Sequence, residues 1–173
     1  MSQYLHHIRA VILDVDGVLT DGTITIGPSG VYKTFNIKDG AGIAHLRDAG
    51  IPVCFLTARS DEATWMRFDD LKLNKNHYIE GCKDKHKGFL HLSKILDIPP
   101  EHIAYMGDDV ADIPALQLAG YSTCPNDAVL EVKEASHKTY SSNGGYGAVR
   151  ELCDEILFAV KQKNSFLPQN NSD

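Results

Sequence analysis

The sequence predicts an α/β fold in which a parallel sheet is covered by helices on both faces. Short, β-rich apolar runs alternate with longer segments of helical periodicity along most of the 173-residue chain. The first run, Ile8–Asp14, is nearly continuous, which is typical of a strand buried on both faces. Distinctive polar residues follow three of these runs, at Asp14, Thr57 and Gly107-Asp108-Asp109. Because ligands of such sheets bind beyond the carboxyl ends of the strands, the alternation also predicts where a functional site lies.

Length and composition fit one soluble globular domain, with 43% hydrophobic and 23% charged residues. The net charge is −6 and there is no dense basic run, which argues against nucleic acid or an anionic membrane as the main partner. No apolar stretch approaches the roughly 20 residues that span a bilayer, and Met1–Arg9 has no signal-peptide pattern. The four cysteines are dispersed, as is typical of packing residues in a reducing cytoplasm. We therefore expect a cytoplasmic protein.

After the first strand, the sequence predicts a hairpin, a helix and a second buried strand. Thr23–Ile26 and Val31–Ile37 flank the turn signal Gly27-Pro28-Ser29-Gly30 and predict a β-hairpin flap at about residues 22–38. Helical periodicity over Ala41–Ala49 ends at a glycine, and Pro52–Thr57 has the composition of a second buried strand.

The remaining elements continue the alternation. Ser60 is placed to cap a helix from Asp61 to about Leu73. Further strands are predicted at Tyr78–Ile79, Ile103–Met106 and Tyr121–Cys124. Further helices are predicted at Lys85–Leu96, about Val110–Ala119, Ala128–Ala135 and Ala148–Lys161. We expect one domain over residues 1–164 and a polar, disordered tail over residues 165–173.

Two acidic clusters follow predicted strands. Asp14 and Asp16 lie two residues apart in a D-x-D-G sequence, and Asp108, Asp109 and Asp112 form a G-D-D-x-x-D sequence. Clustered carboxylates repel one another, and hard oxygen ligands favour Mg²⁺ as the cation that offsets the repulsion. A D-x-D-G sequence also occurs in ordinary turns, and Asp108 and Asp109 are equally suited to cap the next helix. Both interpretations of the second cluster can hold, because only one of the two residues needs to touch a metal.

A hydroxyl and an ammonium group lie between these clusters in the sequence. Thr57 ends the second strand and Lys85 begins a helix. Both side chains suit a phosphoryl group, whose oxygens carry negative charge throughout its transfer. Taken singly, Thr57 is an ordinary strand-end residue and Lys85 an ordinary surface lysine, but their position between two acidic clusters favours a catalytic interpretation.

The order of the four motifs resembles that of the haloacid dehalogenase superfamily over residues 8–124. The resemblance implies a Rossmann-like fold in which Asp14 is the nucleophile that forms an aspartyl phosphate. Asp16 would protonate the leaving oxygen and later deprotonate the attacking water. Mg²⁺ would be held by the Asp14 carboxylate, the Asp16 backbone carbonyl and Asp108.

The same resemblance implies supporting roles for the other motif residues. Thr57 would donate to the phosphoryl oxygens, and Lys85 would neutralise their charge. Asp109 and Asp112 would orient the groups that surround the metal.

Two further features narrow the resemblance. The gap between Asp16 and the second strand holds only the hairpin and one helix, and the gap between Lys85 and Gly107 only a helix and a strand, so a separate cap domain does not fit. The segment Asp21–Ile43, with its D-G start, K-x-F centre and D-G-x-G-I end, and the later GGxGAVRE sequence resemble the 3-deoxy-D-manno-octulosonate 8-phosphate phosphatase family. This resemblance covers nearly the whole chain except the tail. It implies a homotetramer that acts on a small phosphorylated sugar acid in lipopolysaccharide biosynthesis, with a neighbouring subunit closing the site.

Matching positions imply which residues line the substrate pocket. They are Asn36, Lys38, Asp39, Gly40, Arg59 and Arg67, with Asp16 and Lys85 also touching substrate. Arginine suits a sugar-acid carboxylate because its guanidinium binds the two oxygens together. Arg67 fits a solvated helix charge equally well, and Arg150 fits the first turn of a helix better than a ligand contact.

Three departures from the family pattern bear on the substrate. Lys38 stands where the family has arginine, Ala58 replaces the glycine of Thr-Gly-Arg, and Ala44 stands where a basic residue often follows. They leave open a related nine-carbon sugar-acid 9-phosphate as the substrate. The intact catalytic motifs argue against a silent regulatory subunit. The acidic composition argues against a macromolecular substrate, and the missing cap argues against a phosphomutase.

Overall fold

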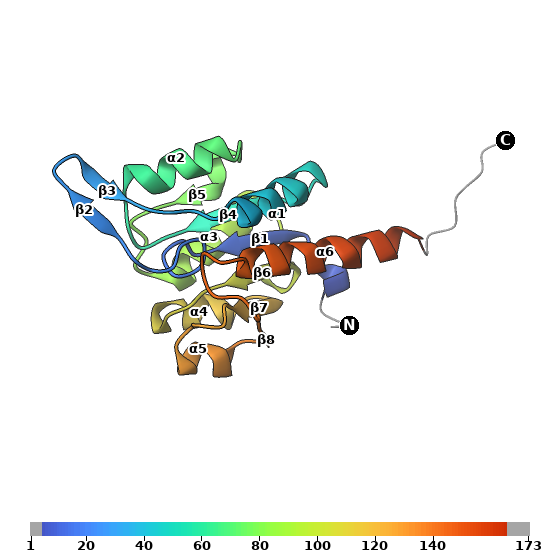
Figure 1. Ribbon diagram of the computed structural model, residues 1–173. Helices are drawn as coiled ribbons and strands as arrows, with labels where there is room; N and C mark the ends of the chain where they lie inside the picture. The colour runs from blue at the N-terminus through green and yellow to red at the C-terminus, as the bar shows by residue number, and fades with distance from the viewer. Residues whose placement is uncertain (1–4, 166–173) are drawn as a thin grey trace.

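The computed structural model of the protein describes residues 5–165. Its centre is a six-stranded parallel sheet with the order β5-β4-β1-β6-β7-β8 (Figure 1). The strands are β1 (Ala10–Leu13), β4 (Val53–Leu56), β5 (Tyr78–Ile79), β6 (Ile103–Met106), β7 (Tyr121–Cys124) and β8 (Lys138–Thr139). The predicted parallel α/β fold is confirmed. Strand β8 was not predicted, because Lys138 and Thr139 are both polar and form no apolar run, whereas the equally short β5 consists of Tyr78 and Ile79.

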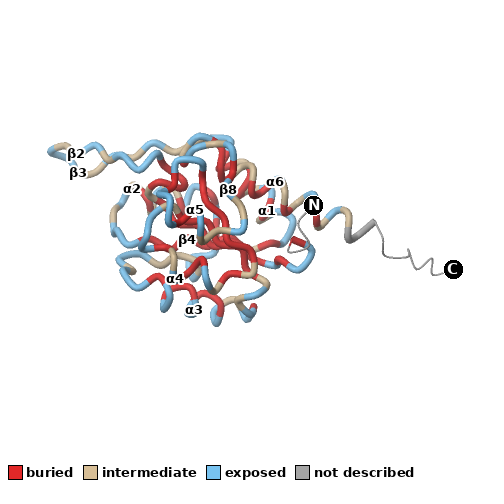
Figure 2. Tube along the Cα trace, turned by 90° about the horizontal axis from the view of Figure 1, so that it is seen from below, coloured by how far each residue is buried: buried red, intermediate tan, exposed pale blue. Residues whose placement is uncertain are grey.

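Helices cover both faces of the sheet. One face packs against α1 (Ile37–Asp48), α2 (Glu62–Asp70) and α6 (Ala148–Ser165), and the other against α3 (Lys85–Leu96), α4 (Ile113–Leu116) and α5 (Leu130–Ala135). Alternate residues of β1 serve the two cores, since Val11 and Leu13 belong to one and Ala10 and Ile12 to the other. Figure 2 shows the buried segments concentrated in the sheet between these layers. Short 3₁₀ turns complete the chain at Leu5–His7, Lys75–His77, Pro100–His102 and Val110–Asp112.

The predicted hairpin is present as β2 (Thr25–Gly27) and β3 (Gly30–Tyr32), which pair antiparallel and project away from the sheet (Figure 1). The predicted second segment, Val31–Ile37, is too long, because β3 ends at Tyr32 and Ile37 already begins α1. The helix starts four residues before the predicted Ala41 because the side chain of Asn36 accepts a hydrogen bond from the Lys38 N–H and caps it.

Two other predicted helices differ from the structure. Asp61, and not Ser60, caps α2 by accepting from the Thr64 N–H at 2.9 Å. Both residue types cap helices well, so the sequence alone could not choose between them. The predicted helix at Val110–Ala119 is a 3₁₀ turn followed by the four-residue α4. The Asp112 carboxylate tightens the turn by accepting hydrogen bonds from the N–H groups of Asp108 and Asp109.

The chain end also differs. Helix α6 continues to Ser165, the first residue of the predicted tail, and the rest of that tail lies outside the described residues. No described helix is long and apolar enough to cross a lipid bilayer.

Within residues 5–165, nothing resembling a cap domain interrupts the sheet. Only the hairpin and α1 lie between β1 and β4, and only the turn at Pro100–His102 lies between α3 and β6. The carboxyl ends of the strands are therefore left open in the isolated chain.

Candidate active site

The predicted catalytic residues meet at the carboxyl edge of the sheet. Asp14 follows β1, Thr57 follows β4 and Asp108 comes just after β6. Because β1 lies between β4 and β6, these positions are neighbours in space. Together they line a cleft of about 290 Å³ whose walls are formed by Asp14, Asp16, Gly22, Thr57, Ala58, Arg59, Lys85, Asp108, Asp109, Ala111 and Asp112.

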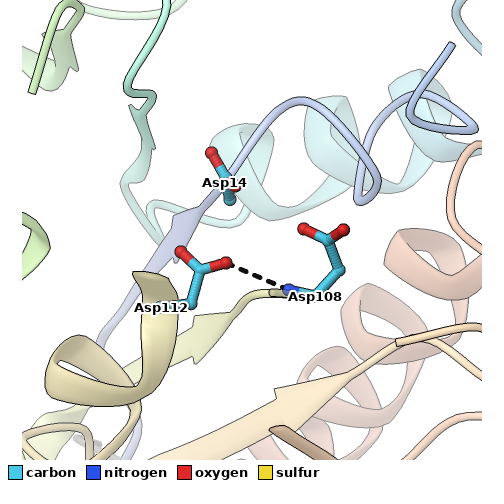
Figure 3. Close-up of side chains that lie close together, drawn as sticks. All are labelled: Asp14, Asp108 and Asp112. Atoms are coloured by element: carbon cyan, nitrogen blue, oxygen red, sulfur yellow. Dashed lines mark hydrogen bonds between the residues drawn. The ribbon is translucent and has the colours of Figure 1, made fainter. Parts of the chain in front are cut away.

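Three carboxylates crowd together at this cleft. Asp14, Asp108 and Asp112 each offer an oxygen within 4.8 Å of the others (Figure 3). Burial raises the pKa of Asp14 to about 7, with the charge of Asp112 adding to it and Lys85 opposing it. Burial likewise raises the pKa of Asp108 to about 8, reinforced by Asp14 and Asp112. The ionised cluster is therefore unfavourable without a bound cation.

The oxygens of Asp112 are already engaged by the protein. Oδ1 accepts from the Tyr105 hydroxyl at 2.6 Å and lies 3.1 Å from Lys85 Nζ. Oδ2 accepts from the backbone N–H groups of Asp108 at 3.1 Å (dashed in Figure 3) and Asp109 at 3.3 Å. Asp112 is therefore the most fully engaged of the three carboxylates that could hold a metal, and Asp14 and Asp108 have more oxygen lone pairs left for one. The buried Oδ1 of Asp108 has no hydrogen-bond partner among the described residues, as expected of a metal ligand.

Of Asp108 and Asp109, it is Asp109 that caps the following 3₁₀ turn. Its side chain accepts from the Val110 N–H at 2.7 Å, and Asp112 closes the capping box. Asp108 is thereby left directed at the carboxylate cluster.

Lys85 is buried and not a surface lysine. Its Nζ lies 2.7 Å from Asp14 Oδ1 and 3.1 Å from Asp112 Oδ1, and donates to the Leu56 carbonyl at 2.8 Å. Burial acts to lower the pKa of Lys85, but Asp14 and Asp112 outweigh it and hold the pKa above its ordinary value. The ammonium therefore stays charged beside Asp14. Thr57 is also buried, with its Oγ1 accepting from the Arg59 N–H at 3.2 Å.

The loop after β1 carries Asp16 through a tight turn. Gly17 has a φ of +85°, and a Cβ there would collide with the Asp108 carboxylate, so only glycine fits. Asp16 Oδ1 forms an ion pair with Lys33 Nζ at 2.7 Å, and Oδ2 lies 3.8 Å from Arg59 Nε. Lys33 was missed as a site residue. Its signal was the lysine of the K-x-F pattern, but that pattern says nothing of where the side chain points.

The glycine-rich segment of the GGxGAVRE sequence packs against the loop that carries Asp16 and Gly17. Gly145 N–H donates to the Val18 carbonyl at 2.9 Å, and Gly144 N–H donates to Asp127 Oδ1 at 2.9 Å. A Cβ on Gly144 would collide with the Gly17 carbonyl oxygen. The glycine therefore permits the close approach of two backbones.

The predicted substrate residues divide into two groups. Asp16, Arg59 and Lys85 line the cleft. The others lie around the start of α1 and are not among its lining residues: Asn36, Lys38, Asp39, Gly40 and Arg67. Most of that second group makes structural contacts.

The clearest of these contacts joins α1 to α6. Asp39 is buried, and its Oδ1 accepts from the Arg150 N–H at 2.8 Å, so it caps α6. Arg67 donates to the Asn36 carbonyl at 3.3 Å and crosses Gly40, where a Cβ would collide with its guanidinium. Arg150 pairs with Asp154 at 2.8 Å, as expected of a first-turn residue.

Comparisons with known proteins agree with this geometry. The family profile of haloacid dehalogenase-like hydrolases matches residues 36–120. The 3-deoxy-D-manno-octulosonate 8-phosphate phosphatase of Haemophilus influenzae is 38% identical over 96% of this chain and 92% of its own length. The enzyme of the same name from Escherichia coli K12 is 40% identical over 88% of this chain and 81% of its own.

Solved structures give the same answer. The cobalt-bound Haemophilus influenzae phosphatase superimposes with a TM-score of 0.89 at 38% identity, over 96% of each chain. The Moraxella catarrhalis enzyme, solved with magnesium, phosphate and KDO, superimposes with a TM-score of 0.88 at 34% identity, over 95% of this chain and 94% of its own. Likeness of this extent in both sequence and structure settles the family: the chain belongs to the 3-deoxy-D-manno-octulosonate 8-phosphate phosphatases of the haloacid dehalogenase superfamily.

Proposed function

We propose that this protein is a Mg²⁺-dependent phosphomonoesterase that hydrolyses 3-deoxy-D-manno-octulosonate 8-phosphate to KDO and phosphate in lipopolysaccharide biosynthesis. The observation that carries the proposal is the cleft in which Asp14, Lys85 and Asp108 meet beside Asp16 and Thr57. We place the reaction in one domain, residues 1–164, and in the cytoplasm, consistent with four free cysteines.

The reaction has two phosphoryl transfers. An Asp14 carboxylate oxygen attacks phosphorus, the ester P–O bond breaks, and Asp16 gives its proton to the leaving sugar oxygen. Water then attacks the same phosphorus while Asp16 takes its proton, the P–O bond to Asp14 breaks, and inorganic phosphate leaves. Lys85 and Thr57 would hold the phosphoryl oxygens.

The cleft residues fit a hard divalent cation. The Asp14 carboxylate, the Asp16 backbone carbonyl and Asp108 would hold it, which accounts for the unpartnered Oδ1 of Asp108 and for the raised pKa values of both acids. Bound Mg²⁺ would supply the positive charge that lets a carboxylate approach a phosphate dianion.

A second copy of the chain would complete the site, and we propose a homotetramer. The cleft has no cap, and the residues around the start of α1 lie outside it. Ile26 and Tyr32 of the hairpin are 76% and 54% exposed, which suits burial in a subunit interface. In such an assembly Asn36, Lys38 and Arg67 of one subunit would line the cleft of another, and the buried Gly40 would leave room for the Arg67 guanidinium. Asp39, which caps α6, would help to hold them in place.

A nine-carbon sugar-acid 9-phosphate remains the alternative substrate. The observation that keeps it open is Ala58, which lines the cleft where the family pattern has glycine. Its added methyl group changes the cleft wall beside Arg59.

Phosphate release from the eight-carbon and nine-carbon esters, measured side by side with Mg²⁺ and with EDTA, tests the proposal. We expect Mg²⁺-dependent release with a clear preference for the eight-carbon ester, and loss of release in EDTA that added Mg²⁺ restores. Preference for the nine-carbon ester would keep the mechanism and change the pathway. Release that is unaffected by EDTA would contradict the metal assignment.

Gly144→Ala should lower both stability and turnover. The added methyl group pushes on the Gly17 carbonyl, so overpacking should cost about 1–3 kcal/mol of unfolding free energy and displace Asp16. Urea unfolding and phosphate release measure the two effects. Gly50→Ala is the control for stability alone. Its φ of +77° makes alanine unfavourable there, so stability falls, but its Cβ meets open space and pushes on no neighbouring backbone. If Gly144→Ala kept full turnover, the glycine-rich segment would not position the catalytic loop.

A further inference from the structure

Lys33 joins the hairpin to the cleft from inside the protein. It follows β3 directly, and its side chain is 0% exposed, while the side chain before it, Tyr32, points into solvent. Burying a lysine ammonium is unfavourable unless anionic or polar partners surround it. The partners of Lys33 therefore indicate why it lies there.

Three oxygen atoms surround the ammonium. Nζ lies 2.7 Å from Asp16 Oδ1 and 2.7 Å from Asp61 Oδ2, and donates to Thr64 Oγ1 at 2.9 Å. Burial acts to raise the pKa of Asp61, but hydrogen bonds from Lys33 and Thr64 outweigh it and hold the pKa below its ordinary value. Asp61 is thus an anion at the start of α2. Its contact with Lys33 does not depend on the protonation state of Asp16.

The two oxygens of Asp16 have different neighbours. Oδ1 faces the buried Lys33, whereas Oδ2 lies 3.8 Å from Nε of Arg59, whose side chain is 48% exposed. Neither oxygen reaches solvent. Arg59 on the Oδ2 side is half-exposed toward the cleft, whereas Lys33 on the Oδ1 side is buried among three oxygen partners inside the protein.

We propose that Lys33 is the positioning residue of Asp16. By holding Oδ1 inside the protein, it fixes the carboxyl group so that Oδ2 is the oxygen that exchanges a proton with the substrate. The inference rests on the proposed function, in which Asp16 protonates the leaving oxygen. It makes the hairpin a part of the proton-transfer geometry as well as a surface feature.

The test compares two leaving groups in wild type and in Lys33→Met. A sugar-acid phosphate releases an alkoxide that needs a proton, whereas p-nitrophenyl phosphate releases a stable anion that does not. Since kcat/KM covers only the steps through the first phosphoryl transfer, the ratio of the two kcat/KM values isolates protonation of the leaving group. We expect Lys33→Met to lower kcat/KM about 10- to 100-fold for the sugar ester and less than about threefold for the aryl ester.

Two further variants separate positioning from general damage. In an Asp16→Asn background, Lys33→Met should leave the ratio unchanged, because both changes remove the same contribution. Lys87→Met is the matched control, since that lysine is 84% exposed in an ion pair with Asp84. Lys87→Met should leave kcat/KM unchanged for both esters. Should Lys33→Met unfold, Lys33→Gln removes the charge but keeps a donor one atom shorter, and it should shift the ratio in the same direction.

The outcomes are distinct. Equal losses on both esters in a folded variant, with wild type active, would overturn the positioning role and leave the phosphatase assignment intact. Wild type without Mg²⁺-dependent activity on either ester would overturn the proposed function, and the inference with it.

Discussion

Replacing Lys85 by methionine is expected to abolish measurable turnover and to lower the free energy of unfolding by about 3–5 kcal/mol. Lys85 is 2% exposed and lies between two buried carboxylates, Asp14 at 2.7 Å and Asp112 at 3.1 Å. Methionine keeps much of the apolar volume but leaves both acids without their cation. Removing one partner of a buried ion pair costs more than the pair contributes, because the remaining charge stays desolvated.

The stability lost in Lys85→Met should be larger at high pH than at low pH. The pKa of Asp14 is already raised to about 7 by burial and by Asp112, and without Lys85 it rises further. A raised pKa means that the folded state binds more protons than the unfolded state, so stability falls as pH rises from about 4 through the folded value. Lys85→Met should therefore lose more stability relative to wild type at pH 8 than at pH 5.5.

Urea unfolding in EDTA at both pH values, together with phosphate release in Mg²⁺, measures these effects. Lys87→Met is again a suitable control, because it removes an exposed ion pair on the same helix. A loss of turnover with no change in unfolding free energy would mean that the buried charge cluster does not contribute to stability.

Asp14→Asn is expected to reduce turnover by at least about 10⁴-fold while the protein stays folded. The amide keeps the shape of the side chain but is a poor nucleophile, and it removes one negative charge from the cluster with Asp108 and Asp112. Because burial makes the Asp14 carboxylate unfavourable, the neutral amide should not destabilise the metal-free protein.

Thermal unfolding with and without Mg²⁺ distinguishes the two roles of Asp14. Wild type should gain thermal stability on adding Mg²⁺, whereas the variant should gain little, since it lacks one of the proposed ligands. Asp48→Asn is the matched control, as Asp48 is an exposed residue at the end of α1 that pairs with Arg47. Substantial turnover in a folded and uncontaminated Asp14→Asn preparation would contradict its assignment as the nucleophile.

Much of the fold follows from local patterns. Continuous apolar runs predicted the central strands, and helical periodicity predicted α3 with both of its ends. The predictions were weaker where capping decides a boundary. Asn36 caps α1, which begins four residues before the predicted start, outside the segment of clear helical periodicity. At α2 the cap is Asp61 and not Ser60, and these two adjacent residues suit a cap about equally well. Strand β8 left no apolar pattern because both of its residues are polar.

The meeting of Asp14, Thr57 and Asp108 also follows from the sequence. Residues that end parallel strands share one edge of the sheet, so the order of motifs along the chain was enough to expect a common cleft. Their chemical roles remain predictions that the variants above test.

The remaining contacts depend on long-range packing of the chain. Asp39 and Arg150 are 111 residues apart and nevertheless share a hydrogen bond, which gives Asp39 a structural task in capping α6. The Asp112 carboxylate contacts Tyr105, Lys85 and two backbone N–H groups. Lys33 extends from the hairpin to Asp16 and Asp61. The physical reason is the range of the forces involved. Secondary structure and strand-end positions depend on residues a few places apart, whereas the burial and partners of a charged side chain depend on which distant segments pack around it.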